Sequence, residues 1–323
     1  VRLLLRWILH YKINYSRCVK CLLFKVVDNK MTDVIREGAV EAAPMTENKM
    51  GVMPVNKLLL GMSVPMMFSM LVQALYNIVD SIFVARIGEN ALTAVSLAFP
   101  LQSLIIALAG GTCVGLNAVL SKALGEKNFE KVNKTATNAI FLMVLNIIVF
   151  FLVGLFAVKP FYTSQTTDAE IVTYGVQYLS IVLMCSFGIF FQFVFDKMLQ
   201  STGNTFYTMI TQMVGALINI VLDPILIFGL FGFPKMGVIG AAVATVAGQI
   251  IAAIVSLIFN LTKNKEINMS FKGFKPDMDI IKQIYKVGVP SIIMQSIGSI
   301  MTYGMNQILI AFSTSDLSIL FFV

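Results

Sequence analysis

Seven apolar segments follow one another along the chain, and short polar stretches separate them. They cover approximately residues 58–85, 92–120, 136–158, 172–195, 206–231, 237–261 and 287–312. At about 1.5 Å of rise per residue, each is long enough to cross a bilayer core of about 30 Å with some tilt. A backbone exposed to lipid must satisfy its own hydrogen bonds. The pattern therefore predicts an all-α polytopic membrane protein.

Positive charge alternates between the loops on the two sides of these segments. One side carries Arg36, Lys49, Lys57, Lys122, Lys127, Lys131, Lys134, Lys197, Lys263, Lys265, Lys272, Lys275, Lys282 and Lys286. The other side has only Arg86, Lys159 and Lys235. Lysine and arginine accumulate on the cytoplasmic side of membrane proteins. We therefore expect a multi-pass protein of the bacterial cytoplasmic (inner) membrane with its N-terminus in the cytoplasm.

Composition agrees with a membrane protein and excludes a nucleic-acid partner. Hydrophobic residues make up 57% of the 323 residues and charged residues only 13%, with a mean hydropathy of +0.83. A soluble domain is about 25% charged. The net charge of +7 lies mainly in the loops and the N-terminal tail, so it reports membrane topology. The expected partners are the lipid bilayer and small amphipathic molecules, with no nucleic acid.

The two ends of the chain interrupt this regular pattern. The first residues contain an apolar run that Arg6 breaks, which is too short to span a membrane. This run could be an interfacial amphipathic anchor. We favour the alternative that residues 1–30 are translated upstream sequence and that the native start is Met31. At the other end, Leu317–Val323 is only a short apolar run, so we expect a chain cut off as it enters an eighth span.

A faint internal repeat suggests a division into two lobes. Lys57 with Val64-Pro65 recurs as Lys282 with Val289-Pro290, at an offset of 225 residues. Such repeats are common in transporters built from two halves. We therefore expect a cytoplasmic tail, a six-helix lobe, a cytoplasmic linker, and the first helix of an incomplete second lobe. Their expected bounds are 1–57, 58–261, 262–286 and 287–323.

Two aspartates lie inside apolar segments, each with an amide side chain about one helical turn earlier. Asn77 precedes Asp80 in the first segment, and Asn219 precedes Asp223 in the fifth. A charged group at the centre of a membrane helix costs roughly 2.5–3.5 kcal/mol on insertion scales. An intramembrane carboxylate is for this reason a candidate functional group. The pattern points to ion or proton handling, although a structural carboxylate–amide hydrogen bond between helices is the alternative.

Further polar side chains extend these faces at helical spacing. Residues three or four apart share one side of a helix, and polar stripes should face each other or a wet cavity. On this basis the candidates for lining a cavity are Gln73, Asn77, Gln192, Gln212 and Gln249, with Thr245 on the sixth segment as a possible ligand. Asp196 also lies in this pattern, but it adjoins Lys197, and we expect the two to form a simple ion pair.

The oxygen-rich groups suit two kinds of coupling ion. Carboxylate, amide and hydroxyl oxygens on neighbouring helices can hold a hard cation such as Na⁺. A carboxylate in the same place can bind and release a proton. Pro224 follows Asp223 and frees the carbonyl of Ile220, which adds an oxygen beside the carboxylate. Both ions stay open at this point, and no other cofactor is expected.

Five ordered segments resemble the multidrug and toxic compound extrusion (MATE) family of transporters. They are Gln73–Gly88, Leu92–Pro100, Leu199–Asn204, Asn219–Gly229 and Gly237–Val246. The resemblance implies twelve helices in two pseudo-symmetric lobes, alternating access, and export of amphipathic, often cationic drugs driven by H⁺ or Na⁺. It also implies a coupling-cation site, including a possible Na⁺ site, at Asp80, Asn219, Asp223 and Thr245. A full-length protein of this kind is expected to be a monomer.

Three other functions remain to be weighed. A lipid-linked oligosaccharide flippase shares the architecture, but its wide cavity would be basic and these spans hold almost no lysine or arginine. An intramembrane aspartyl protease could use Asp80 and Asp223 as a dyad, yet the Tyr-Asp and Gly-x-Gly-Asp contexts of that family are missing. A non-functional half-transporter from a broken gene is the third. We expect a transporter and not an enzyme.

Overall fold

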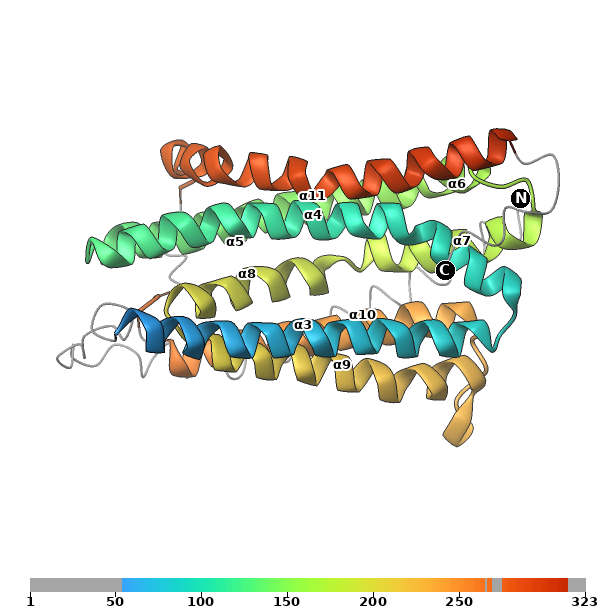
Figure 1. The fold of residues 1–323 in the computed structure, drawn as a ribbon, viewed down its shortest axis with the longest axis horizontal. Coiled ribbons are helices and arrows are strands. Elements are labelled where there is room, and N and C mark those ends of the chain that lie inside the picture. Colours follow the sequence, from blue (N-terminus) through green and yellow to red (C-terminus); the bar gives the residue numbers. More distant parts are fainter. Residues whose placement is uncertain (1–53, 265, 269–274, 313–323) are drawn as a thin grey trace. The chain divides into compact units, whose positions relative to one another are not determined.

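The chain is helical throughout the part that the computed structural model describes, which is residues 54–264, 266–268 and 275–312. In chain order the elements are α3 (Val55–Ala85), α4 (Glu89–Gly125), α5 (Phe129–Phe156), α6 (Val158–Thr163), α7 (Ala169–Met184), α8 (Phe187–Ser201), α9 (Thr205–Phe228), the 3₁₀ turn η1 (Leu230–Gly232), α10 (Val238–Lys263) and α11 (Met278–Phe312) (Figure 1). The expectations for residues 1–30, Met31 and Leu317–Val323 lie outside the described residues.

The first six predicted spans all correspond to helices. By length and composition, α3, α4, α5, α9 and α10 can each cross a membrane. The fourth predicted span, 172–195, is broken: α7 and α8 pass the same test together but meet at an angle of 44°. The break falls at Cys185 and Ser186, between the two helices. The six-helix lobe is therefore present, with one span in two pieces.

The seventh predicted span differs more from expectation. The helix α11 contains residues 287–312 but begins at Met278, so part of the predicted linker 262–286 is helical. Within the described chain, α11 is not among the helices apolar enough to qualify as a membrane span. Polar side chains recur along it at Ser291, Gln295, Ser299, Thr302 and Asn306, which lowers its hydropathy.

The helices pack in two groups that α8 joins. In one group α9 packs against α10 and α3, and in the other α4 packs against α5, α7 and α11. Helix α8 lies between them and contacts α4, α5, α9 and α10 (Figure 1). The apolar core runs through this junction, with Leu120, Met143, Leu183 and Phe190 fully buried. Burial of such side chains contributes about 1.5–3 kcal/mol each relative to exposure.

Glycines allow the closest helix contacts. A Cβ at Gly115 of α4 would collide with the backbone carbonyl of Ile284 in α11, and one at Gly111 would collide with Ile292. In the other group, a Cβ at Gly248 of α10 would lie only 2.8 Å from the carbonyl oxygen of Gly215 in α9. Small residues at such crossings let backbones approach and pack tightly in membranes.

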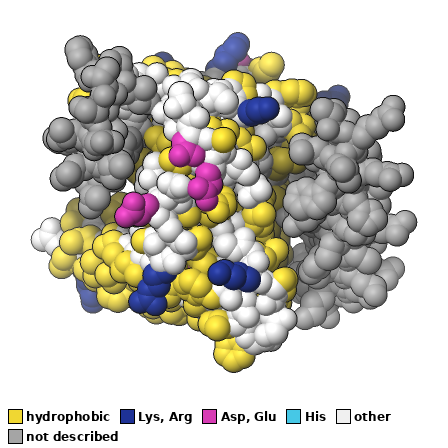
Figure 2. Space-filling model, turned by 90° about the vertical axis from the view of Figure 1, so that its right-hand side faces the viewer, with side chains coloured by type: hydrophobic (Ala, Val, Ile, Leu, Met, Phe, Trp, Pro, Cys, Tyr) yellow, Lys and Arg dark blue, Asp and Glu magenta, His cyan; other side chains and the backbone are white. Residues whose placement is uncertain are grey.

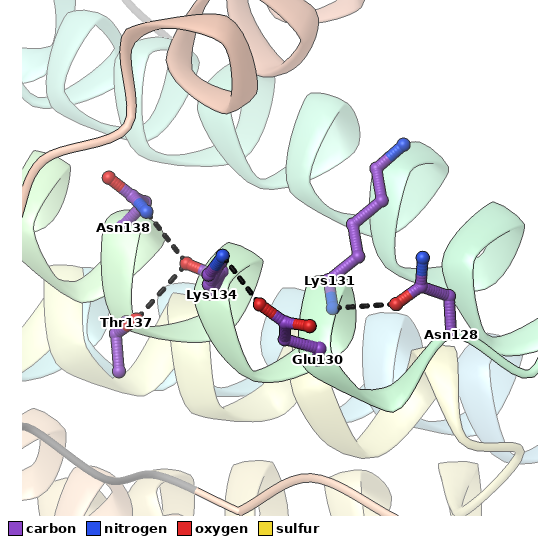
Figure 3. Close-up of polar contacts among 6 residues, drawn as sticks. All are labelled: Asn128, Glu130, Lys131, Lys134, Thr137 and Asn138. Carbon is purple, nitrogen blue, oxygen red and sulfur yellow. Dashed lines mark hydrogen bonds and ion pairs between the residues drawn. The ribbon is translucent and has the colours of Figure 1, made fainter.

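Hydrogen bonds near the start of α5 attach it to the N-terminus of α11. Asn128 caps α5 by accepting a hydrogen bond from the backbone N–H of Lys131 at 3.0 Å, and Lys134 pairs with Glu130 at 2.7 Å (Figure 3). One turn later the Nδ2 of Asn138 donates to the carbonyl of Lys134 at 2.8 Å. Its Oδ1 accepts from the backbone N–H of Asp277 at 3.0 Å, so this buried amide ties α5 to the N-terminus of α11.

The two ends of the described helices differ in charge. One end, which includes the α3–α4 turn and η1, has scattered charged side chains of both signs over an apolar surface (Figure 2). Its described charged residues are Arg86, Glu89, Lys159, Asp168, Glu170 and Lys235. The opposite end carries most of the described lysines, including Lys122, Lys127, Lys131, Lys134, Lys282 and Lys286. This is the asymmetry on which the predicted orientation rests.

Candidate functional site

Two carboxyl groups from distant parts of the sequence meet between α3 and α9. Asp80 lies five residues before the end of α3, and Asp223 lies five before the end of α9. Their side chains are within hydrogen-bonding reach of each other. Asp223 is completely buried, while Asp80 is partly buried. The packing of α3 along α9 therefore brings together the two aspartates that the sequence singled out.

Asn219 connects this pair to α10. It lies one turn before Asp223. In the amide orientation that gives both the nitrogen and the oxygen hydrogen-bond partners, its Nδ2 donates to Asp223 Oδ2 at 3.0 Å. Its Oδ1 then accepts from the hydroxyl and from the backbone N–H of Thr245, both at 3.2 Å. The four residues Asp80, Asn219, Asp223 and Thr245 thus form one cluster across three helices, which we call the carboxylate cluster.

The carboxylate cluster has oxygen atoms left over. Asp80 Oδ1 and Asp223 Oδ1 are both shielded from solvent and have no hydrogen-bond partner among the described residues. Two adjacent carboxylates repel each other, and burial strengthens the repulsion, so a proton or a cation must be shared between them. Carboxylate, amide and hydroxyl oxygens are suitable ligands for Na⁺ as well. The residues present therefore fit either coupling ion.

The helix α9 supplies two members of the cluster and continues through a proline. Pro224 lies inside α9, which runs on to Phe228 and ends at Gly229 in the left-handed conformation, with φ 75°. Proline removes one helical hydrogen bond and frees the carbonyl four residues earlier, which is that of Ile220. This oxygen lies within one turn of both Asn219 and Asp223, where it adds to the polar character of the site.

Comparison with known proteins identifies the family to which the chain is similar. The family model MatE matches residues 65–225, about half of the chain. The multidrug export protein MepA of Staphylococcus saprophyticus is 27% identical over 233 residues, which cover 72% of this chain and 51% of MepA. The chain thus spans about half the length of the curated relatives it matches.

Solved structures show the same fold. An outward-facing multidrug resistance MATE family transporter of the MOP superfamily matches with a TM-score of 0.76 at 29% identity, over 84% of this chain and 60% of that one. A MOP superfamily transporter from Pyrococcus furiosus, described as having a binding pocket of reverse polarity, matches with a TM-score of 0.72 at 29% identity, over 83% and 59%. This chain belongs to the MATE family.

Three residues of the carboxylate cluster fall inside the MATE match. Asp80, Asn219 and Asp223 lie within residues 65–225, whereas Thr245 lies beyond it. The match also covers the broken α7–α8 segment and most of α9. Membership confirms the predicted family and a multi-pass membrane fold. The roles of the individual residues stay predictions, because the match shows the family and not the chemistry of each position.

The predicted cavity residues do not all join the carboxylate cluster. Gln73 contacts Tyr76 on α3, and the side chains of Gln73 and Asn77 are exposed. Gln249 lies beside α8, its Cβ 3.2 Å from the position that a Cβ on Gly188 would take. Among the described residues, no hydrogen bond links Gln192 or Gln249 to the cluster. Their role in lining a cavity remains a prediction.

The expected ion pair between Asp196 and Lys197 is wrong. Asp196 is 4% exposed and accepts hydrogen bonds from Ser256 Oγ at 2.7 Å, Thr211 Oγ1 at 2.9 Å and Gln212 Nε2 at 3.4 Å. Lys197 instead donates to Gln200 Oε1 at 2.7 Å. Consecutive residues on a helix point about 100° apart, so adjacency in sequence does not make them partners. Gln212 therefore belongs to a second polar cluster and not to the Asp80–Asp223 pair.

Two tyrosines near the carboxylate cluster escaped the sequence reasoning. Tyr76 and Tyr178 both lie close enough to Asp80 to interact with it electrostatically. Tyr178 is buried, and its hydroxyl accepts a hydrogen bond from Gln102 Nε2 at 3.0 Å, which links α7 to α4. The spacing of Tyr76, four residues before Asp80, could have identified it as a neighbour on the same helix face. Nothing in the local sequence marks Tyr178.

Proposed function

We propose that this chain supplies the first lobe of a cation-coupled antiporter that exports amphipathic, often cationic drugs. The observation that carries the proposal is the contact between the carboxyl groups of Asp80 and Asp223 inside an apolar helix bundle. Such a pair is stable only when a proton or cation neutralises part of its charge. Loading and unloading of that ion would therefore change the electrostatic energy of the lobe.

The coupling mechanism follows from thermodynamic linkage. If the coupling ion and the drug favour opposite-facing states of an alternating-access cycle, ion entry promotes drug release, and the effect is reciprocal. Asp80 and Asp223 would bind the ion, while Asn219 and Thr245 would orient Asp223 and provide neutral oxygens. The similarity to a multidrug export protein and to a multidrug resistance transporter supports the same assignment.

The proposed cellular setting is the bacterial cytoplasmic membrane, with the N-terminus in the cytoplasm. It is supported by the concentration of lysines at one end of the helices and by staphylococcal relatives. A cysteine introduced at Lys127, in the lysine-rich α4–α5 turn, should resist labelling by a membrane-impermeant maleimide in whole cells. A cysteine introduced at Lys235 should be labelled. The reverse pattern would overturn the orientation.

The central experiment is drug efflux by the Asp223→Asn variant, expressed from its full-length gene. Asparagine keeps the shape of the side chain but cannot carry the charge or exchange a proton, so efflux should be abolished while the amount of protein in the membrane stays the same. The matched control is Asp168→Asn, at the exposed N-cap of α7, where asparagine caps equally well. Normal efflux by Asp223→Asn would refute the proposed role.

A gradient experiment identifies the coupling ion. Drug transport into proteoliposomes should be driven by a pH gradient or by a Na⁺ gradient. The gradient that drives transport by the original protein should not drive transport by Asp223→Asn. A carboxylate pair with neutral oxygen ligands suits either ion. Equal drug movement with no ion gradient, or gradient-driven movement that Asp223→Asn leaves intact, would contradict coupling through this site.

A further inference from the structure

A second intramembrane carboxylate has its own polar surroundings, apart from the carboxylate cluster. Asp196 of α8 is enclosed by Thr211 and Gln212 of α9 and by Ser256 of α10, and it is 4% exposed. Ser256 and Thr211 are both 0% exposed. No salt bridge is formed by Asp196 in the described part of the chain. We call Asp196, Thr211, Gln212 and Ser256 the α8–α10 site.

The protons of the α8–α10 site can be counted. The hydroxyl oxygen of Thr211 lies 2.9 Å from Asp196 Oδ1 and 2.7 Å from the backbone carbonyl oxygen of Thr208. A hydroxyl has one proton to donate and two lone pairs to accept with. If Thr211 donates to the Thr208 carbonyl, it can accept a proton from a neutral Asp196. If Asp196 is ionised, a rotation of the same hydroxyl turns its proton to the carboxylate.

This arrangement satisfies both forms of the carboxyl group. In the ionised form Asp196 accepts from Thr211, Gln212 and Ser256, and donors to a charged acceptor form the stronger hydrogen bonds. In the neutral form the chain Asp196–Thr211–Thr208 runs in one direction and leaves no proton without an acceptor.

We propose that Asp196 is a second proton-binding site of this lobe, distinct from the Asp80–Asp223 pair. Its ligand is the proton, and Thr211 and Ser256 are positioning residues that accommodate the two protonation states. Binding of the proton does not depend on the proposed function. Only the use of that proton in drug export rests on it.

The two sites are separated along α9. Thr211 and Gln212 lie seven or eight residues before Asn219, which corresponds to about 11 Å along the helix axis. Between them α9 and α10 cross at Gly215 and Gly248, where the backbones are in close contact. This crossing lies between the two sites, and neither Asp80 nor Asp223 is among the groups that act electrostatically on Asp196.

A polar path leads from Asp196 toward the end of α10. Ser256, Asn260 and Asn264 lie four residues apart on one face of this helix, and all are at most 5% exposed. Asn260 donates to the carbonyl of Phe195 at 2.9 Å, and Asn264 donates to Asn260 Oδ1 at 3.1 Å. The Oδ1 of Asn264, at the C-cap of α10, is shielded and has no hydrogen-bond partner within the described residues. This face carries a line of buried polar side chains from the α8–α10 site to the C-terminal end of α10.

Few charged groups lie close enough to Asp196 to influence its protonation. Lys197 on α8 and Cys113 on α4 are the titratable groups that act on it electrostatically, and the amine of Lys197 is directed to Gln200. Within the described residues, α5, α9 and α10 present only neutral side chains to it. Burial, and after it the hydrogen bonds from Ser256, Thr211 and Gln212, therefore have the largest influence on the protonation of Asp196.

Infrared difference spectroscopy of the purified full-length protein tests the proposal directly. The carbonyl stretch of a protonated carboxyl group should appear as pH is lowered through the range of about 9 to 5. The component of this band that comes from Asp196 should be missing in Asp196→Asn and should persist in the double variant Asp80→Asn/Asp223→Asn. Loss of the band only in the double variant, or no band that depends on Asp196 anywhere in this range, would overturn the proposal.

A second pair of variants works even if Asp196→Asn does not fold. Thr211→Val removes the hydroxyl but keeps the branched shape, whereas Thr211→Ser keeps the hydroxyl. Loss of a donor weakens the ionised form more than the neutral form, so Thr211→Val should move the midpoint of the titration to higher pH by about one unit. Thr211→Ser should leave the midpoint close to that of the original protein. Identical titration midpoints in all three proteins would exclude the proposed role of the Thr211 hydroxyl. Drug efflux by the same variants is measured in a separate assay. A failure of the proposed antiporter function can therefore be told apart from a failure of proton binding at Asp196.

Discussion

Asn219 and Asp223, one turn apart on α9, are joined by a hydrogen bond of 3.0 Å from the amide nitrogen to Oδ2. The other end of the same amide accepts from Thr245 on α10. Asn219 is 3% exposed, so no water replaces it readily. The orientation of Asp223 therefore depends on a neutral side chain that is itself held by a third helix.

This dependence predicts the effect of Asn219→Ala. Hydrogen bonds to charged groups contribute about 1.5–3 kcal/mol, so the affinity for the coupling ion should fall at least about tenfold. The ion concentration that gives half-maximal drug efflux measures it. Asn90→Ala, which removes a hydrogen bond to Glu170 at the end of the bundle, should leave that concentration unchanged. An equal shift in both variants would show a general effect on stability.

Helical spacing and the cost of burial singled out the two aspartates of the carboxylate cluster, whereas the resemblance to the MATE family supplied its full membership. Asn219 and Asp223 share a helix face. In an apolar bundle the carboxylate of Asp80 is expected to face other polar groups in the interior. Asp196 shows the limit: its partners Ser256 and Thr211 come from other helices, and only the packing of α8 against α9 and α10 reveals them.

Other features depend on contacts that a local pattern does not contain. The apolar run 172–195 continues through the break at Cys185 and Ser186, so hydropathy alone predicted one span. The early start of α11 at Met278 is stabilised by Asn138 of α5, which lies far away in sequence. The close approach of α4 and α11 is a further example, because the sequence around Gly115 does not show which helix packs against it.

The contact at Gly115 predicts a large cost for a small substitution. A methyl group there would collide with the carbonyl of Ile284, a backbone atom that cannot rotate away. Overpacking of this kind typically costs about 1–3 kcal/mol, so Gly115→Ala should lower the thermal unfolding temperature of the purified protein. Gly61→Ala is the matched control, because no atom lies within 4 Å of the added Cβ on α3. It should be neutral or slightly stabilising, by up to about 1 kcal/mol.

A buried hydroxyl links α6 to α4. Tyr162 is 0% exposed, and its OH donates to the carbonyl of Ala94 at 2.7 Å. Tyr162→Phe keeps the ring and removes this bond, so the free energy of unfolding should fall by about 1 kcal/mol. Tyr303→Phe removes a hydroxyl that meets Ser164 in an exposed contact, and water can replace it. No difference between the two variants in thermal unfolding would argue against the buried bond.

The amide of Asn138 controls the start of α11. Asp277 donates its backbone N–H to Asn138 Oδ1, and its own carboxylate caps the helix by accepting from the N–H of Asp279 at 3.0 Å. Asn138→Ala removes the acceptor, so the first turn of α11 should open more often and the amides of residues 277–281 should exchange about tenfold faster with deuterium. Lys122→Gln removes another exposed ion pair, that with Glu126, and should leave exchange unchanged. Unaltered exchange in Asn138→Ala would mean that contacts between α11 and α4 alone hold this turn in place.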